Sequence, residues 1–180
     1  SKIFSVVLNK DWESGVSLKT SYTNQDITSA HTSGSATAGS NYGFNTTINR
    51  NEAIVGRSGY ETEHRLVVNL GYEAEFVAGY KTNINLFFER KSGNPITFYA
   101  DGNRANGLND PYGLLSPGTY NDSFLPYIPT PGDENVTFTS AEKETEFHSA
   151  INSLGLDQYA GGYLPKGVLT TPWVTTLDLS

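Results

Sequence analysis

The sequence contains no cysteine and no methionine. Without cysteine the chain can have no disulfide framework, no thiolate metal site and no cysteine nucleophile. Charged residues are also scarce, at 17% against about 25% in average globular domains. The formal net charge is −7, and the Lys and Arg residues form no cluster. Because phosphate binding requires clustered cations, no nucleic-acid partner is expected.

Long apolar runs are missing as well. The first residues, SKIFSVVLNKDW, lack the basic start and apolar run of a signal peptide, and no window approaches the ~20 apolar residues of a transmembrane helix. His31, His64 and His148 lie in different segments without the spacing of metal ligands, and no G-x-S-x-G motif occurs. We therefore predict that the chain is not an enzyme.

What the sequence does contain is alternation of apolar and polar residues. Residues 3–10, 16–23, 64–72 and 81–89 each place apolar side chains at every second position, the pattern of an antiparallel strand with one apolar face. Residues 96–100 and 172–180 continue the pattern as two further strands. The sequence therefore predicts a mainly β fold, an antiparallel up-and-down meander in a single domain over residues 1–180.

The connections between these strands differ greatly in length. Short turns follow residues 10 and 72, whereas residues 24–62 and 101–170 are predicted as long loops rich in turn-forming residues. The second loop carries a helix signal over 140–154: Thr139 and Glu142 have capping-box spacing, and Phe147, Ile151 and Leu154 repeat at helical intervals. Gly155 is placed to end this helix.

Two interpretations fit this pattern. A soluble antiparallel sheet also alternates, which would make the chain a self-contained β-sheet binding or adhesin-like module. However, strands of about 9–11 residues are long enough to cross a bilayer when tilted, and long loops at one end with short turns at the other are typical of outer-membrane barrels. The loop asymmetry favours the second interpretation, in which the apolar stripe faces lipid and the polar stripe faces a wet lumen.

Four segments and their order also resemble a known family. The residues are His64-Arg65, the segment Phe87-Phe88-Glu89-Arg90-Lys91-Ser92-Gly93 followed by Pro95, Tyr127-Ile128-Pro129, and Thr171-Pro172-Trp173-Val174 with Leu177-Asp178-Leu179. Together they resemble the late barrel strands of TonB-dependent outer-membrane receptors, in the Oar-like group that carries a carboxypeptidase-regulatory-like domain. The resemblance covers essentially the whole chain.

The resemblance implies a fold, a location and partners. Such receptors are barrels of about 22 strands with a plug domain inside, so the chain is expected to be a barrel slice without its plug. It implies an outer membrane of a Gram-negative bacterium, contact with outer-membrane lipid, with the plug domain and with the TonB complex, and a role in binding and uptake of an unidentified substrate.

Three groups of residues are candidate functional sites. Residues that share the polar faces of the strands are expected to face the lumen: Lys19, Arg65, Asn69, Asn83, Asn85 and Glu89. Aromatic residues in the loops are candidates for a ligand surface: Tyr42, Phe44, Tyr112, Tyr120 and Tyr127. Asp101, Asn103 and Asp110 supply oxygen atoms for a Ca²⁺ loop, the one cofactor considered, although the terminal bidentate Glu is missing and a polar turn cluster is the alternative.

Overall fold

The computed structural model describes residues 1–31, 35–43, 46–49, 51–98 and 124–180. The chain divides into two compact units. We call Ser1–Thr28, Arg57–Ile96 and Leu169–Ser180 the sheet unit, and Ser29–Gly56 with Thr97–Val168 the loop unit. The fold is mainly β with antiparallel sheets, which confirms the predicted fold class at that level.

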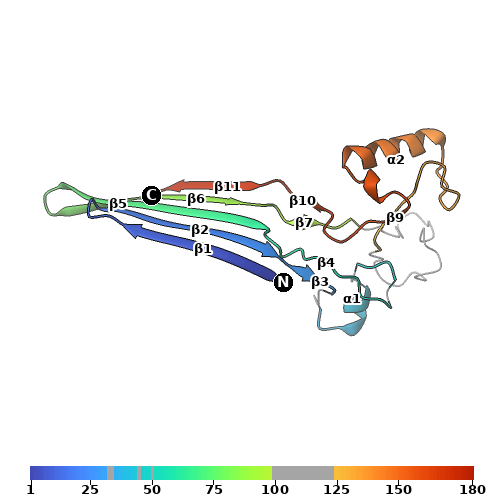
Figure 1. The fold of residues 1–180 in the computed structure, drawn as a ribbon, viewed down its shortest axis with the longest axis horizontal. Coiled ribbons are helices and arrows are strands. Elements are labelled where there is room, and N and C mark those ends of the chain that lie inside the picture. The colour runs from blue at the N-terminus through green and yellow to red at the C-terminus, as the bar shows by residue number, and fades with distance from the viewer. Residues whose placement is uncertain (32–34, 44–45, 50, 99–123) are drawn as a thin grey trace. The chain divides into compact units, whose positions relative to one another are not determined.

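Five antiparallel strands form the sheet of the sheet unit, side by side in Figure 1. They are β1 (Lys2–Asp11), β2 (Val16–Asp26), β5 (His64–Val77), β6 (Tyr80–Lys91) and β11 (Val174–Leu179), in the order β1-β2-β5-β6-β11. Each strand pairs with the next of these five along the chain, as a meander requires. All five were predicted from alternation, and most extend two or more residues further than the alternation does.

The ends of the sheet have different connections. At one end, residues 12–15 join β1 to β2 and residues 78–79 join β5 to β6. In the first turn, the Trp12 amide donates to the Val16 carbonyl at 2.9 Å, and Gly15 has φ 85°. A Cβ at Gly15 would lie 2.2 Å from the Glu73 carbonyl oxygen, so this position requires glycine. At the other end, residues 27–63 and 92–173 make the long connections.

Short elements lie within the segments that the sequence predicts as long loops. Among the described residues, three two-residue pairings occur: β3 (Thr28–Ser29) with β4 (Gly56–Arg57), β7 (Pro95–Ile96) with β10 (Leu169–Thr170), and β8 (Tyr127–Ile128) with β9 (Gly162–Tyr163). The elements α1 (Ala38–Gly43), α2 (Ala141–Ser153) and η2 (Asp157–Tyr159) are helical. Of the elements within these two loops the sequence predicts only the helix α2, because two-residue backbone pairings leave no apolar periodicity in a sequence.

Two predicted strand boundaries need correction. The strand predicted over 96–100 pairs only at Pro95–Ile96; Thr97 instead uses its hydroxyl oxygen to accept from the Gly167 amide at 2.9 Å, and residues 99–100 lie outside the described residues. The strand predicted from residue 172 begins at Val174. Pro172 has no N–H to give to a ladder, which explains the later start.

The predicted helix is confirmed as α2, with a different N-cap. The Ser140 side chain accepts from the Lys143 amide at 3.3 Å, so the cap lies one residue after Thr139. Gly155, with φ 67°, follows the last turn, and its amide donates to the Asn152 carbonyl at 2.9 Å.

The buried hydrophobic side chains gather in the loop unit. Within the described part of the chain they are Phe124, Leu125, Ile128, Leu156 and Leu164, and all five belong to that unit. The Leu125 amide donates to the Thr47 carbonyl at 2.9 Å, so the two segments of the loop unit are joined at this core. Lys166 donates to the Ala30 carbonyl at 2.9 Å, and burial lowers the pKa of this lysine.

Candidate functional site

One face of the five-stranded sheet is predominantly apolar. The register aligns two complete rows across β2, β5, β6 and β11: Leu18, Leu70, Leu86, Leu179 and Thr20, Val68, Phe88, Leu177. Leu8 of β1 extends the second row, and Tyr72 paired with Ile84 adds a third. We call this the apolar face. Leu177 is 67% exposed and Leu179 is 70% exposed, so the face is open to its surroundings.

The opposite face, which we call the polar face, holds all six residues predicted to face a lumen. The register places Lys19 beside Asn69, Asn83 beside Glu73, Asn85 beside Gly71, Glu89 beside Val67, and Arg65 in the next row. Arg65 donates to the Glu89 carboxylate at 2.7 Å. Val67 and Phe87 share this face, so it is mixed rather than uniformly polar.

Aromatic rings form a row at one end of the apolar face, where the long connections leave the sheet. The ring of His64 stacks between those of Tyr22 and Trp173, with centroid distances of 6.2 and 5.9 Å. The Tyr22 hydroxyl and His64 Nδ1 are hydrogen bonded at 2.8 Å. The Arg90 guanidinium lies over the Trp173 ring, 5.4 Å from its centroid, which is a cation–π contact.

Residues from three of the four segments of the family resemblance meet beside this row, whereas the fourth, Tyr127-Ile128-Pro129, lies in the loop unit. The His64 amide donates to the Ser92 hydroxyl at 3.0 Å, and the Ser92 amide donates to the His64 carbonyl at 2.8 Å. The Asn94 amide donates to the Thr171 hydroxyl at 2.8 Å. Gly93 lies against the Thr171 carbonyl so closely that a Cβ there would clash. The motifs are distant in sequence, but they close one corner of the sheet unit.

Sequence reasoning missed an ion cluster near the same end of the sheet. Glu61 is only 2% exposed; it accepts from the Arg57 Nε at 2.8 Å and from the Ile27 amide at 2.7 Å. Arg57 also donates to Glu63 at 2.9 Å. No spacing rule marks these residues, because the cluster depends on the turn between β4 and β5.

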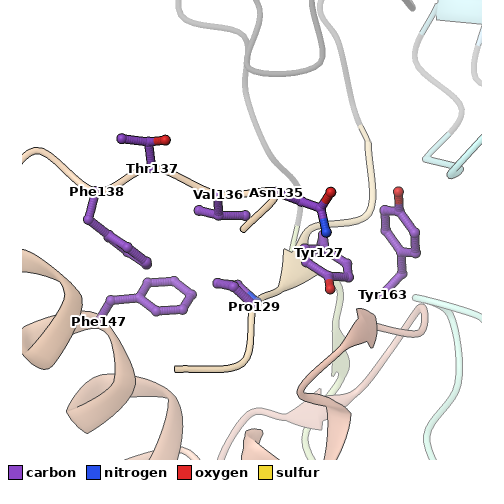
Figure 2. Close-up of a pocket in the computed structure, with 8 residues that line it drawn as sticks. All are labelled: Tyr127, Pro129, Asn135, Val136, Thr137, Phe138, Phe147 and Tyr163. Carbon is purple, nitrogen blue, oxygen red and sulfur yellow. The ribbon is translucent and has the colours of Figure 1, made fainter. Parts of the chain in front are cut away.

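The loop unit contains a pocket of about 770 Å³. Its lining comes from three segments that the fold brings together: Tyr127, Pro129, Asn135, Val136, Thr137, Phe138, Phe147 and Tyr163. Figure 2 shows Phe138 and Phe147 at one end, Tyr127 and Tyr163 at the other, and Pro129 and Val136 between them. We call this the aromatic pocket. One of its residues, Tyr127, was among the predicted loop aromatics.

Asp133 organises the tyrosine end of the aromatic pocket. Its carboxylate accepts from the Tyr127 hydroxyl at 2.7 Å and from the Asn135 amide nitrogen and side chain at 2.9 and 3.0 Å. The hydrogen bond from Tyr127 lowers the pKa of the Asp133 carboxyl below its ordinary 3.8, and the same bond raises the pKa of Tyr127 above 10.0. Between pH 3.8 and pH 10.0, Asp133 is therefore an anionic carboxylate and Tyr127 a neutral phenol.

This pair predicts a measurable pH dependence. Because the pKa of Asp133 is lower in the folded chain, its contribution to stability is present above pH 3.8 and is lost as the pH falls through the lower folded value. We expect Tyr127→Phe to raise the pKa of Asp133, measured by the ¹³C shift of its carboxyl during an NMR titration. Tyr159→Phe, a control in the same unit, should leave it unchanged. An unchanged titration in Tyr127→Phe would contradict the assignment.

The remaining predicted residues are not brought together. Tyr42 lies on α1 and is exposed. Phe44, Tyr112 and Tyr120, as well as the Ca²⁺ candidates Asp101, Asn103 and Asp110, lie outside the described residues. Elsewhere, over the part of the chain that is described, no group of three or more His, Asp and Glu side chains could hold a metal ion.

Within the described ranges, no helix combines the length and the apolar character that a membrane-crossing helix needs.

Comparison with known proteins finds no relative of the chain. No protein-family model, no curated protein and no solved structure matches the chain.

Proposed function

We propose that the sheet unit forms part of the barrel wall of a TonB-dependent outer-membrane receptor, and that the intact protein binds and takes up a substrate from outside the cell. The exposed apolar face of the sheet is the observation that carries this proposal. Burying a Leu or Phe side chain is favourable by about 1.5–3 kcal/mol, so two rows of such residues left in water forgo a large stabilisation. Lipid would cover them.

The aromatic residues at the two ends of the apolar face support the same proposal. Tyr22, His64 and Trp173 lie at one end, and Tyr72, in the row beside the Trp12 turn, lies near the other. Eight residue steps along β5 separate His64 from Tyr72, roughly 26 Å at ~3.3 Å per residue. A strand tilt of about 40° reduces this height to about 20 Å, close to the roughly 25 Å apolar band of outer-membrane barrels.

The edges and the polar face fit a barrel wall as well. β1 and β11 are the outer strands of the sheet, and neighbouring barrel strands would pair with their free edges. The polar face, with the Arg65–Glu89 ion pair, would then line the lumen, where its side chains would meet water and the plug domain. Energy for uptake would come from the TonB complex.

The first test asks whether the apolar face contacts lipid. We expect the full chain, diluted from urea, to insert into phosphatidylcholine vesicles. In Trp12→Phe, the remaining Trp173 should be quenched more by lipids brominated near the headgroup than by lipids brominated deep in the acyl chain. This follows because Trp173 lies in the aromatic row at one end of the face.

A pair of substitutions on β11 makes this test specific to one face. Leu177 lies on the apolar face, in the row of Val68 halfway between His64 and Tyr72, whereas Thr176 lies on the polar face. An Arg on the lipid side at mid-depth costs about 2–4 kcal/mol, so Leu177→Arg should strongly reduce insertion and Thr176→Arg should not. If the chain stays monomeric in buffer, unfolds cooperatively and does not bind vesicles, the result would contradict this proposal and support the soluble adhesin-like module.

A further inference from the structure

We propose that the aromatic pocket of the loop unit binds a neutral oligosaccharide. This inference uses only residues of the loop unit and does not depend on the receptor proposal. Its volume of about 770 Å³ lies within the range of about 300–1,000 Å³ that is usual for small-ligand sites.

The lining is held in place by contacts within the loop unit. Tyr127 and Tyr163 are paired residues of β8 and β9, and their rings meet edge to face at 5.5 Å between centroids. Phe147 of α2 contacts Phe138 with a centroid distance of 5.5 Å. Glu144 of α2 accepts from the Gly132 amide at 2.9 Å, which ties the helix to the chain that carries the pocket. The pocket is therefore formed before any ligand arrives.

The aromatic groups at both ends suit the apolar faces of sugar rings. A pyranose presents C–H groups on its ring faces and hydroxyl groups around its edge. Flat aromatic rings with a polar tip bind surfaces of that mixed kind, because ring and hydroxyl each meet a matching group. Figure 2 shows the Phe138–Phe147 pair and the Tyr127–Tyr163 pair separated by Pro129 and Val136, an arrangement that offers two stacking places to one extended ligand.

The charge and the hydrogen-bonding groups of the lining favour a neutral ligand that carries hydroxyl groups. None of the described lining residues is charged, so an anionic ligand would find no counter-charge. The Asn135 Nδ2 donates to Asp133 Oδ1, which leaves the side-chain oxygen as an acceptor. The hydroxyls of Tyr163 and Thr137, which lack hydrogen-bond partners in the described ranges, can both donate and accept. Sugar hydroxyls also do both, whereas a proline-rich peptide offers almost only acceptors.

Calorimetric titration of the full chain tests this inference with named probes. The probes are the neutral hexasaccharides of cellulose, amylose, xylan and mannan, an anionic heparin hexasaccharide, and a proline decapeptide. We expect at least one neutral hexasaccharide to bind and the other two probes not to bind. Binding of none of the four neutral sugars, or of only the heparin or peptide probe, would overturn the proposal.

Substitutions at Tyr163 locate the binding. Tyr163→Ala should weaken it about tenfold, since it removes a stacking ring, and Tyr163→Phe about threefold, since it keeps the ring and removes one hydrogen bond. Tyr60→Ala removes an 83% exposed tyrosine of the sheet unit and should change nothing. Because Tyr163→Phe preserves the packing, it remains informative if the alanine variant misfolds.

The result of the sugar titration does not depend on the result of the vesicle experiment. Sugar binding that is equally strong in Tyr163→Ala, Tyr163→Phe and the unchanged chain would place the ligand elsewhere and overturn the proposal. Lipid insertion depends on the apolar face of the sheet unit, so failure of insertion would leave the sugar result standing, and the converse also holds.

Discussion

Gly93→Ala is expected to destabilise the sheet unit by about 3 kcal/mol or more, at the upper end of the cost of overpacking. Gly93 is buried, and a Cβ at this position would lie 1.9 Å from the Thr171 carbonyl oxygen and 2.4 Å from the carbonyl carbon. Both atoms belong to the backbone, so no side-chain rotation relieves the clash. The chain would have to separate Gly93 from Thr171, which would break the Asn94–Thr171 hydrogen bonds beside them.

The measurement uses a property of the sequence. Both tryptophans, Trp12 and Trp173, lie in the sheet unit, so tryptophan fluorescence during urea unfolding follows that unit alone. The unfolding is measured in the buffer or detergent that keeps the chain monomeric. Gly59→Ala is the matched control, because nothing lies within 4 Å of a Cβ at Gly59 and its φ is not positive. Equal unfolding midpoints for the two variants would contradict the packing at Gly93.

Glu61→Ala is expected to destabilise the same unit by about 1.5–3 kcal/mol, the usual cost of losing hydrogen bonds that involve a charged group. The Glu61 carboxylate neutralises Arg57 and accepts from the Ile27 amide, and the side chain is almost completely buried. Its loss leaves the Ile27 amide without its acceptor and leaves Arg57, whose side chain is 31% exposed, paired with Glu63 alone.

Glu63→Ala is the control for this prediction. Glu63 binds the same Arg57, but its side chain is 45% exposed, so its loss should cost at most about 1 kcal/mol. Urea unfolding followed by tryptophan fluorescence compares the two variants. Equal losses of stability in the two variants would show that burial does not set the energy of this cluster.

The corner where Gly93 lies also gives the sequence motifs a physical meaning. The segments that resemble receptor strands contribute Ser92, which is hydrogen bonded to His64, and Trp173, which stacks on His64. The Arg90 guanidinium makes a cation–π contact with the Trp173 ring. These residues close the end of the sheet where the long connections begin. Each of these residues therefore has a packing role in the sheet unit.

Much of the fold could be predicted because strands and helices leave local signals. Alternation located β1, β2, β5, β6 and β11, since the side-chain period of a strand is two residues. The same period separated Lys19, Asn69 and Glu89 from the leucines of the apolar face before any register was known. The helix α2 followed from a cap, an apolar repeat and Gly155, all of which lie within one short segment.

Other features left no local signal. Glu61 resembles any surface carboxylate in the sequence, yet the turn after β4 buries it against Arg57. The aromatic pocket joins Tyr127, Phe147 and Tyr163, which lie far apart in the chain and share no spacing rule. Only the pairing of β8 with β9 and the position of α2 bring their rings together.

The sequence by itself determined which residues form the strands and which side chains share a face, because both depend on a period of two along the chain. It also excluded cysteine chemistry, because the chain contains no cysteine. The tertiary structure alone decided that the buried core lies in the loop unit while the apolar face of the sheet stays exposed. Burial depends on what each surface meets in space, and alternation is the same whether an apolar face meets protein, water or lipid.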